Sequence, residues 1–315
     1  EFTSKVDLLC GGGEYDHNQA HLQGLTVEPW PADAPPAGLW TNTAGELLIP
    51  EGLAGERWRT PYFFGCVVSA FGICCNLDRL QELGLSGPVG RWEELANPKL
   101  YGQVAVADPT KSGSMAKAFE MIVQQQCAES VRAAGFTDAQ AEDFEASYAT
   151  GGGASGERPP GVPAAYDAAV ARGWDNGLRL LQRIGANARY FTDAASKVAI
   201  DVSQGDAAAG LIIDFYARYQ AQYSRDADGR ARMVYLTPPG GSSVSADPVS
   251  LLRGAPHRAT ALRVIEFLLS EEGQRLWAYR PGTPGGPVHY ALCRLPIRRD
   301  FYPSAAPSLQ KAWQR

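Results

Sequence analysis

Hydrophobic runs alternate with amphipathic segments along the chain. The run at 6–10 ends at three glycines and predicts a short buried strand. The run at 62–76 is aromatic and β-branched, with Gly65 and Gly72 inside it. It predicts one long, bent, buried strand. Shorter runs predict strands at 103–107, 207–213, 233–236 and 248–252.

Helical periodicity fills the intervals between these runs. Helices are predicted at 77–84, 91–95, 166–184 and 258–269, with a further turn capped by Ser270 and a Gly/Pro-rich loop at 151–163. A further helix is predicted after residue 114, because apolar residues recur there at helical spacing: Met115, Ala118, Phe119, Ile122 and Val123. The apolar face of 166–184 is expected to comprise Val170, Trp174, Leu178, Leu181 and Ile184. The alternation predicts an α/β fold with mixed, mostly parallel sheets flanked by helices.

Length and charge narrow the class of protein. A chain of 315 residues favours two compact lobes, because one core stops growing at about 250–300 residues. Lys and Arg number 29 against 34 Asp and Glu, which gives a net charge of −5. The nearest basic cluster, Arg294 with Arg298 and Arg299, is interrupted by Pro296. We therefore expect no nucleic-acid partner, because phosphate backbones are bound by basic stripes.

The chain shows no targeting or metal-binding pattern. No run approaches the ~20 apolar residues of a membrane-spanning helix, and residues 1–5 do not resemble a signal peptide. The six cysteines include no C-x-x-C pair, so no metal site is expected. Cys10, Cys66, Cys74 and Cys75 lie in apolar runs and are expected to be structural core thiols. We also expect a monomer that carries no cofactor.

The strongest candidate binding site is the segment Thr110, Lys111, Ser112, Gly113 and Ser114. It joins a predicted strand to a predicted helix. Unpaired N–H groups at a helix start, together with hydroxyls and an ammonium group, can hold a phosphate, phosphonate or carboxylate. Alternatively, a serine is only the N-cap and Lys111 is solvated. The nucleotide-binding pattern G-x-x-x-x-G-K-[ST] is absent, which excludes an ATP site of that type.

Three other segments lie where strands end. Asp214 and Tyr216 follow the strand at 207–213 and could line a crevice, although core packing and helix capping are equally consistent. Thr192, next to Asp193, suits either a ligand contact or an N-cap. The triplet Gly11, Gly12 and Gly13 either permits close approach of a ligand or forms a plain turn.

Catalytic patterns are poor. The motifs G-x-S-x-G, H-E-x-x-H and G-x-G-x-x-G are all missing. His17 and His21 are four residues apart, but two ligands do not make a metal site. A nucleophilic Cys74 or Cys75 stays open, although an apolar setting raises the pKa of a thiol. We expect no catalytic residue.

The chain resembles the family 1 extracellular solute-binding proteins of ABC importers, especially the branch handling ferric ion, phosphonates and similar small anions. The resemblance covers nearly the whole chain. It implies the type 2 periplasmic-binding-protein fold, in which two α/β lobes joined by two crossing strands close over a ligand. Five segments in the family's order carry it: VDLLCGGG, FFGCVVSAFGICCNLDRL, RWEELANPKLYGQVAVADPTKSGS, GDAAAGLIIDFY and PPGGSSVSADPVSLLRGAPHRATALRVIEFLLSEEGQRLW.

The resemblance also implies which residues bind. The family's anion-holding SGS-type helix start falls on Ser112 to Ser114, and its paired iron-binding tyrosines fall on Phe215 and Tyr216. The first tyrosine is thus absent, and glycines occupy 11–13, where ferric binders carry a carboxylate. Fe(III) prefers such hard oxygen ligands, so a phosphonate or similar organic anion fits better.

We therefore expect the substrate-binding component of an ABC importer, holding a small anionic solute in an interlobe cleft and delivering it to a membrane permease. Lobe 1 is expected to comprise 1–70 and 243–290, and lobe 2 to comprise 71–242 and 291–315. Relatives place a strand-helix-strand segment before the VDLL-like strand, so the chain is either a fragment or short at its start. The family is exported, which implies a periplasmic or extracellular location. Alternatives are a ferric-ion binder, an enzyme or a sensory domain on the same fold.

Overall fold

A computed structural model describes residues 4–31, 36–53, 56–151 and 158–302. The chain divides into two compact units. Unit 1 comprises Glu1–Ala70, Ile213–Tyr223 and Ser243–Arg315, and unit 2 comprises Phe71–Ile212 and Ser224–Ser242. The expected division into lobes stays a prediction; in the structure, 213–223 and the described part of 291–315 group with unit 1, which differs from that division at two places. The reason for the second difference is a strand at 295–296 that pairs with Val67 and Val68.

Unit 1 is built around strand β10 (Val244–Leu252). Its partners are β1 (Leu8–Cys10), β2 (Thr26–Val27) and the first half of β5 (Phe64–Asn76), and β5 also pairs with β11 (Leu295–Pro296). All these pairs are antiparallel. A separate two-stranded sheet joins β3 (Gly52–Leu53) to β4 (Glu56–Arg57).

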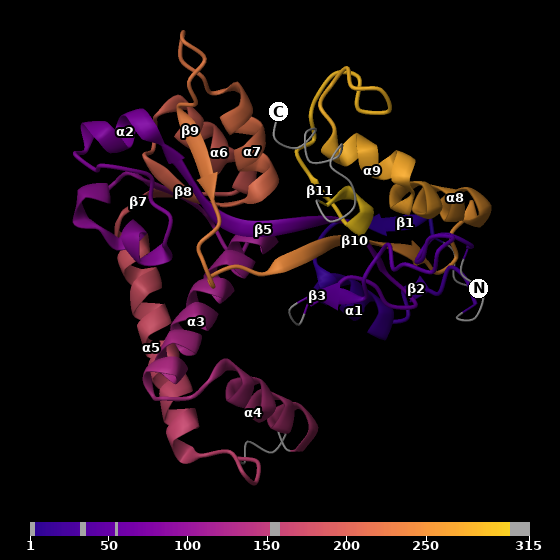
Figure 1. Cartoon of the computed structure of the whole chain (residues 1–315), viewed down its shortest axis with the longest axis horizontal. Helices are drawn as coiled ribbons and strands as arrows, with labels where there is room; N and C mark the ends of the chain where they lie inside the picture. Colours follow the sequence, from indigo (N-terminus) through magenta and orange to yellow (C-terminus); the bar gives the residue numbers. More distant parts are fainter. Residues whose placement is uncertain (1–3, 32–35, 54–55, 152–157, 303–315) are drawn as a thin grey trace. The chain divides into compact units, whose positions relative to one another are not determined.

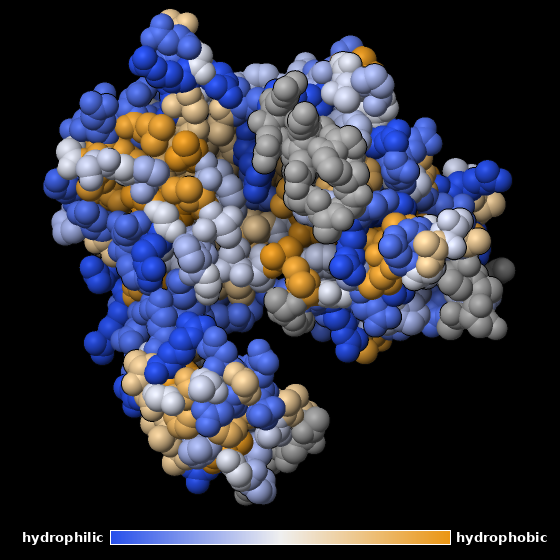
Figure 2. All heavy atoms as spheres, viewed as in Figure 1, coloured by the Kyte–Doolittle hydropathy of each residue, from blue (hydrophilic) through white to orange (hydrophobic). Residues whose placement is uncertain are grey.

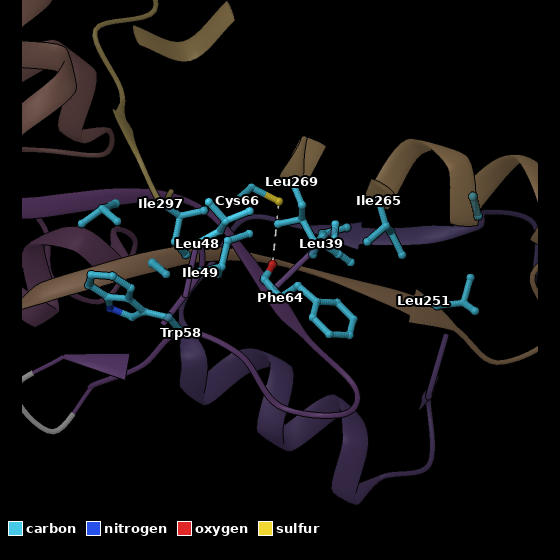
Figure 3. Close-up of a cluster of buried hydrophobic side chains, with 14 residues drawn as sticks. Leu39, Leu48, Ile49, Trp58, Phe64, Cys66, Leu251, Ile265, Leu269 and Ile297 are labelled. Carbon is cyan, nitrogen blue, oxygen red and sulfur yellow. Dashed lines mark hydrogen bonds between the residues drawn. The ribbon is translucent and has the colours of Figure 1, made fainter. Parts of the chain in front are cut away.

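Helices cover both faces of this sheet. In Figure 1, α8 (Arg258–Leu269) and α9 (Glu271–Ala278) lie on one face and α1 (Glu14–Leu22) on the other. Unit 1 also contains α7 (Asp214–Tyr223) and the short η3 (Arg299–Phe301). Figure 3 shows the core between the sheet and α8, in which Leu251, Ile265 and Leu269 are fully buried.

Unit 2 has parallel strands at its centre. Strand β6 (Val104–Ala107) pairs in parallel with β7 (Ala188–Thr192) and β8 (Ala209–Ile213), and β9 (Met233–Leu236) pairs antiparallel with the second half of β5. The expected predominance of parallel pairing therefore applies to β6 and its neighbours and is wrong for unit 1, where β10 runs back along β5. The strands predicted at 62–76, 103–107, 207–213, 233–236 and 248–252 are confirmed.

Most of the described α-helices and 3-10 helices belong to unit 2. They are α2 (Leu77–Glu82), η1 (Trp92–Ala96), η2 (Pro98–Leu100), α3 (Gly113–Ala133), α4 (Asp138–Gly151), α5 (Ala164–Ala186) and α6 (Ala195–Gln204). A small second core joins Val131, Val162 and Tyr166 to the aromatic side chains of α4. Figure 2 shows hydrophobic residues at the surface over α4. This small core is too thin to bury all of its apolar side chains.

Helices α3 and α5 pack through small residues. The buried residues of α5 include Ala169, Gly173 and Gly177, whereas Trp174 is 54% exposed and Leu178 49%. The expected apolar face is therefore wrong at these two positions. A Cβ on Gly173 would lie 2.3 Å from the Cα of Cys127, so glycine is what lets the two backbones approach.

Candidate functional site

The loop between β6 and α3 is a folded turn that ends in a helix cap. The Asp108 carboxylate accepts hydrogen bonds from the Thr110 N–H at 2.9 Å and hydroxyl at 2.7 Å, and these bonds hold the pKa of Asp108 below its usual range. The Asp108 carbonyl accepts the N–H groups of Lys111 and Ser112, each at 3.0 Å. The backbone therefore enters α3 in a fixed direction.

Ser112 is the N-cap of α3. Its Oγ accepts the Met115 N–H at 3.4 Å and lies 3.2 Å from the Ser114 Oγ. The N–H groups of Gly113 and Ser114 have no hydrogen-bond partner within the described residues. Gly113 is exposed and Ser114 half-buried, so these donors remain accessible at the positive end of a 21-residue helix. The alternative N-cap role of Ser112 is thus confirmed, and it coexists with free donors.

Lys111 and Thr192 flank this helix start. The Lys111 ammonium is exposed and lies 3.9 Å from Asp108 Oδ2, which is a weak surface pair. Thr192 aligns with Ala107 on the neighbouring strand, and its carbonyl accepts the Asp108 N–H at 2.7 Å. The buried Thr192 hydroxyl donates to the Ala194 carbonyl at 2.8 Å. The structure thus brings Thr192 beside the loop with its hydroxyl already engaged.

The glycine triplet of unit 1 forms a tight backbone turn before α1. Gly11 and Gly12 both have φ of +80°, a conformation that favours glycine. A Cβ on Gly12 would lie 2.8 Å from Asp16 Oδ2, the same oxygen that accepts the Gly13 N–H at 2.9 Å. The triplet is therefore a held turn with exposed backbone, and a ligand-binding role for it stays a prediction.

His17 stabilises this turn through a hydrogen bond to its backbone. The fully buried imidazole lies between the Gly11 carbonyl, 2.9 Å from Nε2, and the Ser250 hydroxyl, 2.7 Å from Nδ1. Because a carbonyl only accepts, Nε2 carries the proton and Nδ1 accepts from Ser250. His21, by contrast, stacks on Tyr62 at 3.5 Å. The two histidines thus have separate structural roles.

His17→Gln is expected to reduce stability most at neutral pH. Burial lowers the pKa of His17, so the folded chain keeps it neutral while the unfolded chain protonates it near pH 6.5. The wild type should lose stability as pH falls below about 6.5. The free energy of unfolding of the variant should therefore be about 1–3 kcal/mol below that of the wild type at pH 7.5, and this difference should become smaller toward pH 5. Urea unfolding across this pH range measures it.

His289→Gln, at an exposed position, is the matched control for this series. It should follow the wild type at each pH. A deficit for His17→Gln that stayed constant from pH 7.5 to 5 would contradict the assigned neutral, buried imidazole.

Helix α7 carries the remaining predicted residues. Asp214 is fully buried, and its nearest cation is Arg218, with Nε 3.4 Å from Oδ2. Burial raises the pKa of Asp214 to about 6, and the Arg218 charge opposes that shift. Tyr216 is 36% exposed, so its phenol is the more accessible of the two. Contact of either side chain with a ligand stays a prediction.

Arg294 is the residue that sequence reasoning missed. Its guanidinium lies 3.4 Å above the Phe215 ring, and it forms a close ion pair with Asp247 and a bond of 3.4 Å to the Ser69 hydroxyl. No local motif marks this contact, because 47 residues separate Arg294 from Asp247. The network places a guanidinium, itself paired with Asp247, on the Phe215 ring.

The predicted residues therefore gather into two sets. In unit 2, Thr192 joins Lys111, Ser112, Gly113 and Ser114. In unit 1, Gly11 donates its N–H to the Pro248 carbonyl at 2.9 Å, and the preceding residue, Asp247, binds the arginine that covers Phe215.

Neither metal binding nor thiolate catalysis is favoured by the thiols and acidic side chains of the described residues. No cluster of three or more His, Cys, Asp or Glu suited to a metal occurs in the described part of the chain. All six cysteines are free, and burial raises the pKa of Cys75 to about 12 and that of Cys74 well above its usual value. A thiolate nucleophile is therefore disfavoured at either position. Cys10 is exposed, so its prediction as a core thiol is wrong.

Comparisons with known proteins bear on the family and the fold of the chain. The family model described as "Bacterial extracellular solute-binding protein" matches residues 49–292, more than half of the chain. The fructose-6-phosphate-bound periplasmic binding protein AfuA of Actinobacillus pleuropneumoniae superposes with a TM-score of 0.57 at 19% identity, covering 86% of this chain and 65% of that one. The apo ferric ion-binding protein A of Pasteurella haemolytica also gives 0.57, at 15% identity, covering 99% and 75%.

One curated relative is the phosphoglycerate transport regulatory protein PgtC of Salmonella typhimurium, 21% identical over 278 residues, which are 88% of this chain and 52% of the relative. An uncharacterized protein of Haemophilus influenzae is 22% identical over 233 residues, 72% of this chain and 52% of that protein. The chain thus spans about half the length of the curated relatives it matches.

The chain belongs to the bacterial extracellular solute-binding family, and its fold is that of the type 2 periplasmic binding proteins. Proteins of this family bind small ligands and deliver them to ABC permeases. Among the described residues, no helix combines the length and hydrophobicity needed to cross a membrane.

Proposed function

We propose that this chain is the substrate-binding component of an ABC importer and captures a small organic anion, a phosphonate or a similar solute, at the start of α3. The free N–H groups of Gly113 and Ser114 carry this proposal. They point out of a helix start whose dipole favours negative charge. The Ser112 and Ser114 hydroxyls share one hydrogen bond at 3.2 Å, which leaves one hydroxyl proton to donate to a ligand. The exposed Lys111 offsets the charge of the nearby Asp108.

Unit 1 supports an anion rather than a metal cation. Where ferric binders carry a tyrosine hydroxyl, this chain has Phe215 with a guanidinium 3.4 Å above its ring. Arg294 is ion-paired with Asp247, so the feature of this position that disfavours Fe(III) is the missing phenol oxygen, a hard ligand of the kind that Fe(III) prefers. The names of two relatives agree, since one structure holds fructose-6-phosphate and one protein is named for phosphoglycerate transport. Both compounds are phosphorylated organic anions.

The proposed setting is the periplasm or the cell exterior, with a membrane permease as partner. Family membership supports this location, because the family is extracellular and its structural neighbours include periplasmic proteins. The proposed reaction is binding and release with no covalent change. The ligand shifts the conformational equilibrium only by its extra affinity for one state.

Ser114→Asp is expected to weaken binding of methylphosphonate and inorganic phosphate at least tenfold while leaving the fold intact. A carboxylate beside the free N–H groups competes for them and repels the ligand by about 1–4 kcal/mol at contact distance. The same charge favours a helix start, so stability should hold. Isothermal titration calorimetry measures the affinity.

Ser86→Asp, which adds the same charge at an exposed loop position, is the control and should bind as the wild type does. Equal affinities of Ser114→Asp and wild type for every anion that the wild type binds would overturn the site. An affinity lost equally in both variants would show a long-range charge effect and would also overturn it.

A further inference from the structure

Unit 1 contains a hollow of about 480 Å³ that shares no residue with the α3 helix start. This volume lies in the range of small-molecule sites, about 300–1,000 Å³. Its walls come from the segments before and within β4 and β5, and they are mainly aromatic and basic. The residues that matter below are Trp30, Trp40, Arg57, Arg59, Tyr62 and Phe64.

The indole rings of Trp30 and Trp40 form one wall of the hollow, and both pack on the buried ring of Phe64. The rings of Trp30 and Trp40 lie 5.3 and 5.4 Å from the ring of Phe64, which is only 4% exposed. Trp30 and Trp40 themselves are half-buried and line the hollow. Large aromatic faces that are already packed on one side present apolar surface to a ligand with little further loss of side-chain entropy.

Tyr62 is held in position as well. Its ring stacks on His21 with centroids 3.5 Å apart and planes at 2°, and its hydroxyl donates to Asn18 Oδ1 at 2.8 Å. The phenol is therefore already fixed by contacts outside the hollow. Another ring of the pocket is preorganised without a ligand.

The charged side chains of the pocket are two guanidinium groups and one carboxylate. Arg59 lies 4.7 Å over the Trp40 ring, and its terminal nitrogen is 3.2 Å from Glu51 Oε1. Its Nε is buried and has no hydrogen-bond partner in the described residues. Arg57 is exposed and forms no ion pair within the same residues. The Glu14 carboxylate accepts the Arg57 backbone N–H at 3.0 Å, not its guanidinium. The lining itself thus has two guanidinium groups against one carboxylate, and one buried donor is left without an acceptor.

We propose that this pocket binds a planar organic anion, an aromatic ring that bears a carboxylate or a phosphate. The ring would lie against Trp30 and Trp40, and the anionic group would face Arg57 and Arg59. Guanidinium groups match carboxylate and phosphate oxygens in geometry, and a lining with two guanidinium groups and one carboxylate favours an anion over a cation. This proposal goes beyond the proposed function and does not depend on it.

The test is calorimetric titration of the full chain with 2-naphthoate and 2-naphthyl phosphate. Two comparison compounds separate ring from charge: 2-naphthamide keeps the ring, and cyclohexanecarboxylate keeps the charge. We expect at least one naphthyl anion to bind about tenfold more tightly than either comparison compound, a factor that corresponds to 1.4 kcal/mol. The preferred anion identifies carboxylate or phosphate as the recognised group.

Three variants locate the site. Trp40→Ala should weaken binding about tenfold or more, and Arg57→Gln should remove the preference for the anion over the amide. Trp174→Ala removes a tryptophan that is 54% exposed on α5 and should change nothing. Because Trp40 packs on Phe64, circular dichroism must show that Trp40→Ala folds; the exposed Arg57 gives an independent answer if it does not.

The proposal is overturned if neither naphthyl anion shows saturable binding at millimolar concentration. It is equally overturned if Arg57→Gln keeps the full preference for the anion, or if Trp174→Ala weakens binding as much as Trp40→Ala does.

Discussion

Gly173→Ala is expected to lower the free energy of unfolding by about 3 kcal/mol, although alanine usually stabilises a helix by about 1 kcal/mol relative to glycine. The added Cβ would lie 2.3 Å from the Cα and 2.7 Å from the N of Cys127. Both atoms belong to the backbone of α3, so no side chain can rotate away. The two helices must separate, and the surrounding core then loses contacts. Urea unfolding followed by circular dichroism gives the value.

Gly185→Ala is the control within the same helix. Its Cβ would meet only the end of the Phe191 ring, at 3.8 Å. This variant should be as stable as the wild type or up to about 1 kcal/mol more stable. If Gly173→Ala were as stable as Gly185→Ala, the close packing of α3 on α5 would be wrong.

Asp214→Asn is expected to make the chain more stable at pH 8, by up to about 3 kcal/mol. The pKa of Asp214 is raised from 3.8 to about 6 in the folded chain, so folding favours the protonated form. The stabilisation is complete below about pH 4 and is lost as pH rises through about 6; two pKa units correspond to about 3 kcal/mol. Asparagine stays neutral and avoids this loss. Unfolding free energies at pH 4, 6 and 8 measure the difference.

The difference between Asp214→Asn and wild type should grow with pH. Asp193→Asn, which removes an exposed carboxylate, should show no such growth. A variant that is less stable than wild type at pH 8 would mean that the ion pair with Arg218 outweighs the cost of burial.

The long elements of the fold could be predicted because their patterns are local. The run at 62–76 is apolar apart from Ser69 and Asn76, and most of it becomes β5, in which all but one residue is buried. The N-cap at Ser112 is likewise a short-range signal, set by one hydroxyl and an N–H three residues on. These features required no knowledge of which segments pack together.

Features that depend on tertiary contact could not be predicted. Hydrophobicity predicts that Trp174 and Leu178 lie on the buried face of α5, but the close approach of the α3 backbone buries Gly173 and Gly177 instead. Likewise, the position of Arg294 over Phe215 follows only from the pairing of β11 with β5.

The aromatic pocket shows the same limit. Trp30 lies in a proline-rich segment and Trp40 follows it, where no periodicity predicts an element. Both rings are placed by contact with Phe64, which is more than twenty residues further along the chain. Aromatic composition alone could not distinguish a core from a pocket.

The exposure of Cys10 has a practical use. It is the exposed one of the six thiols, and it directly precedes the glycine turn that His17 supports. A maleimide dye attached there would sit beside Gly11 without any engineered cysteine. The fluorescence of such a dye would report a change in the surroundings of the glycine turn, such as ligand binding there.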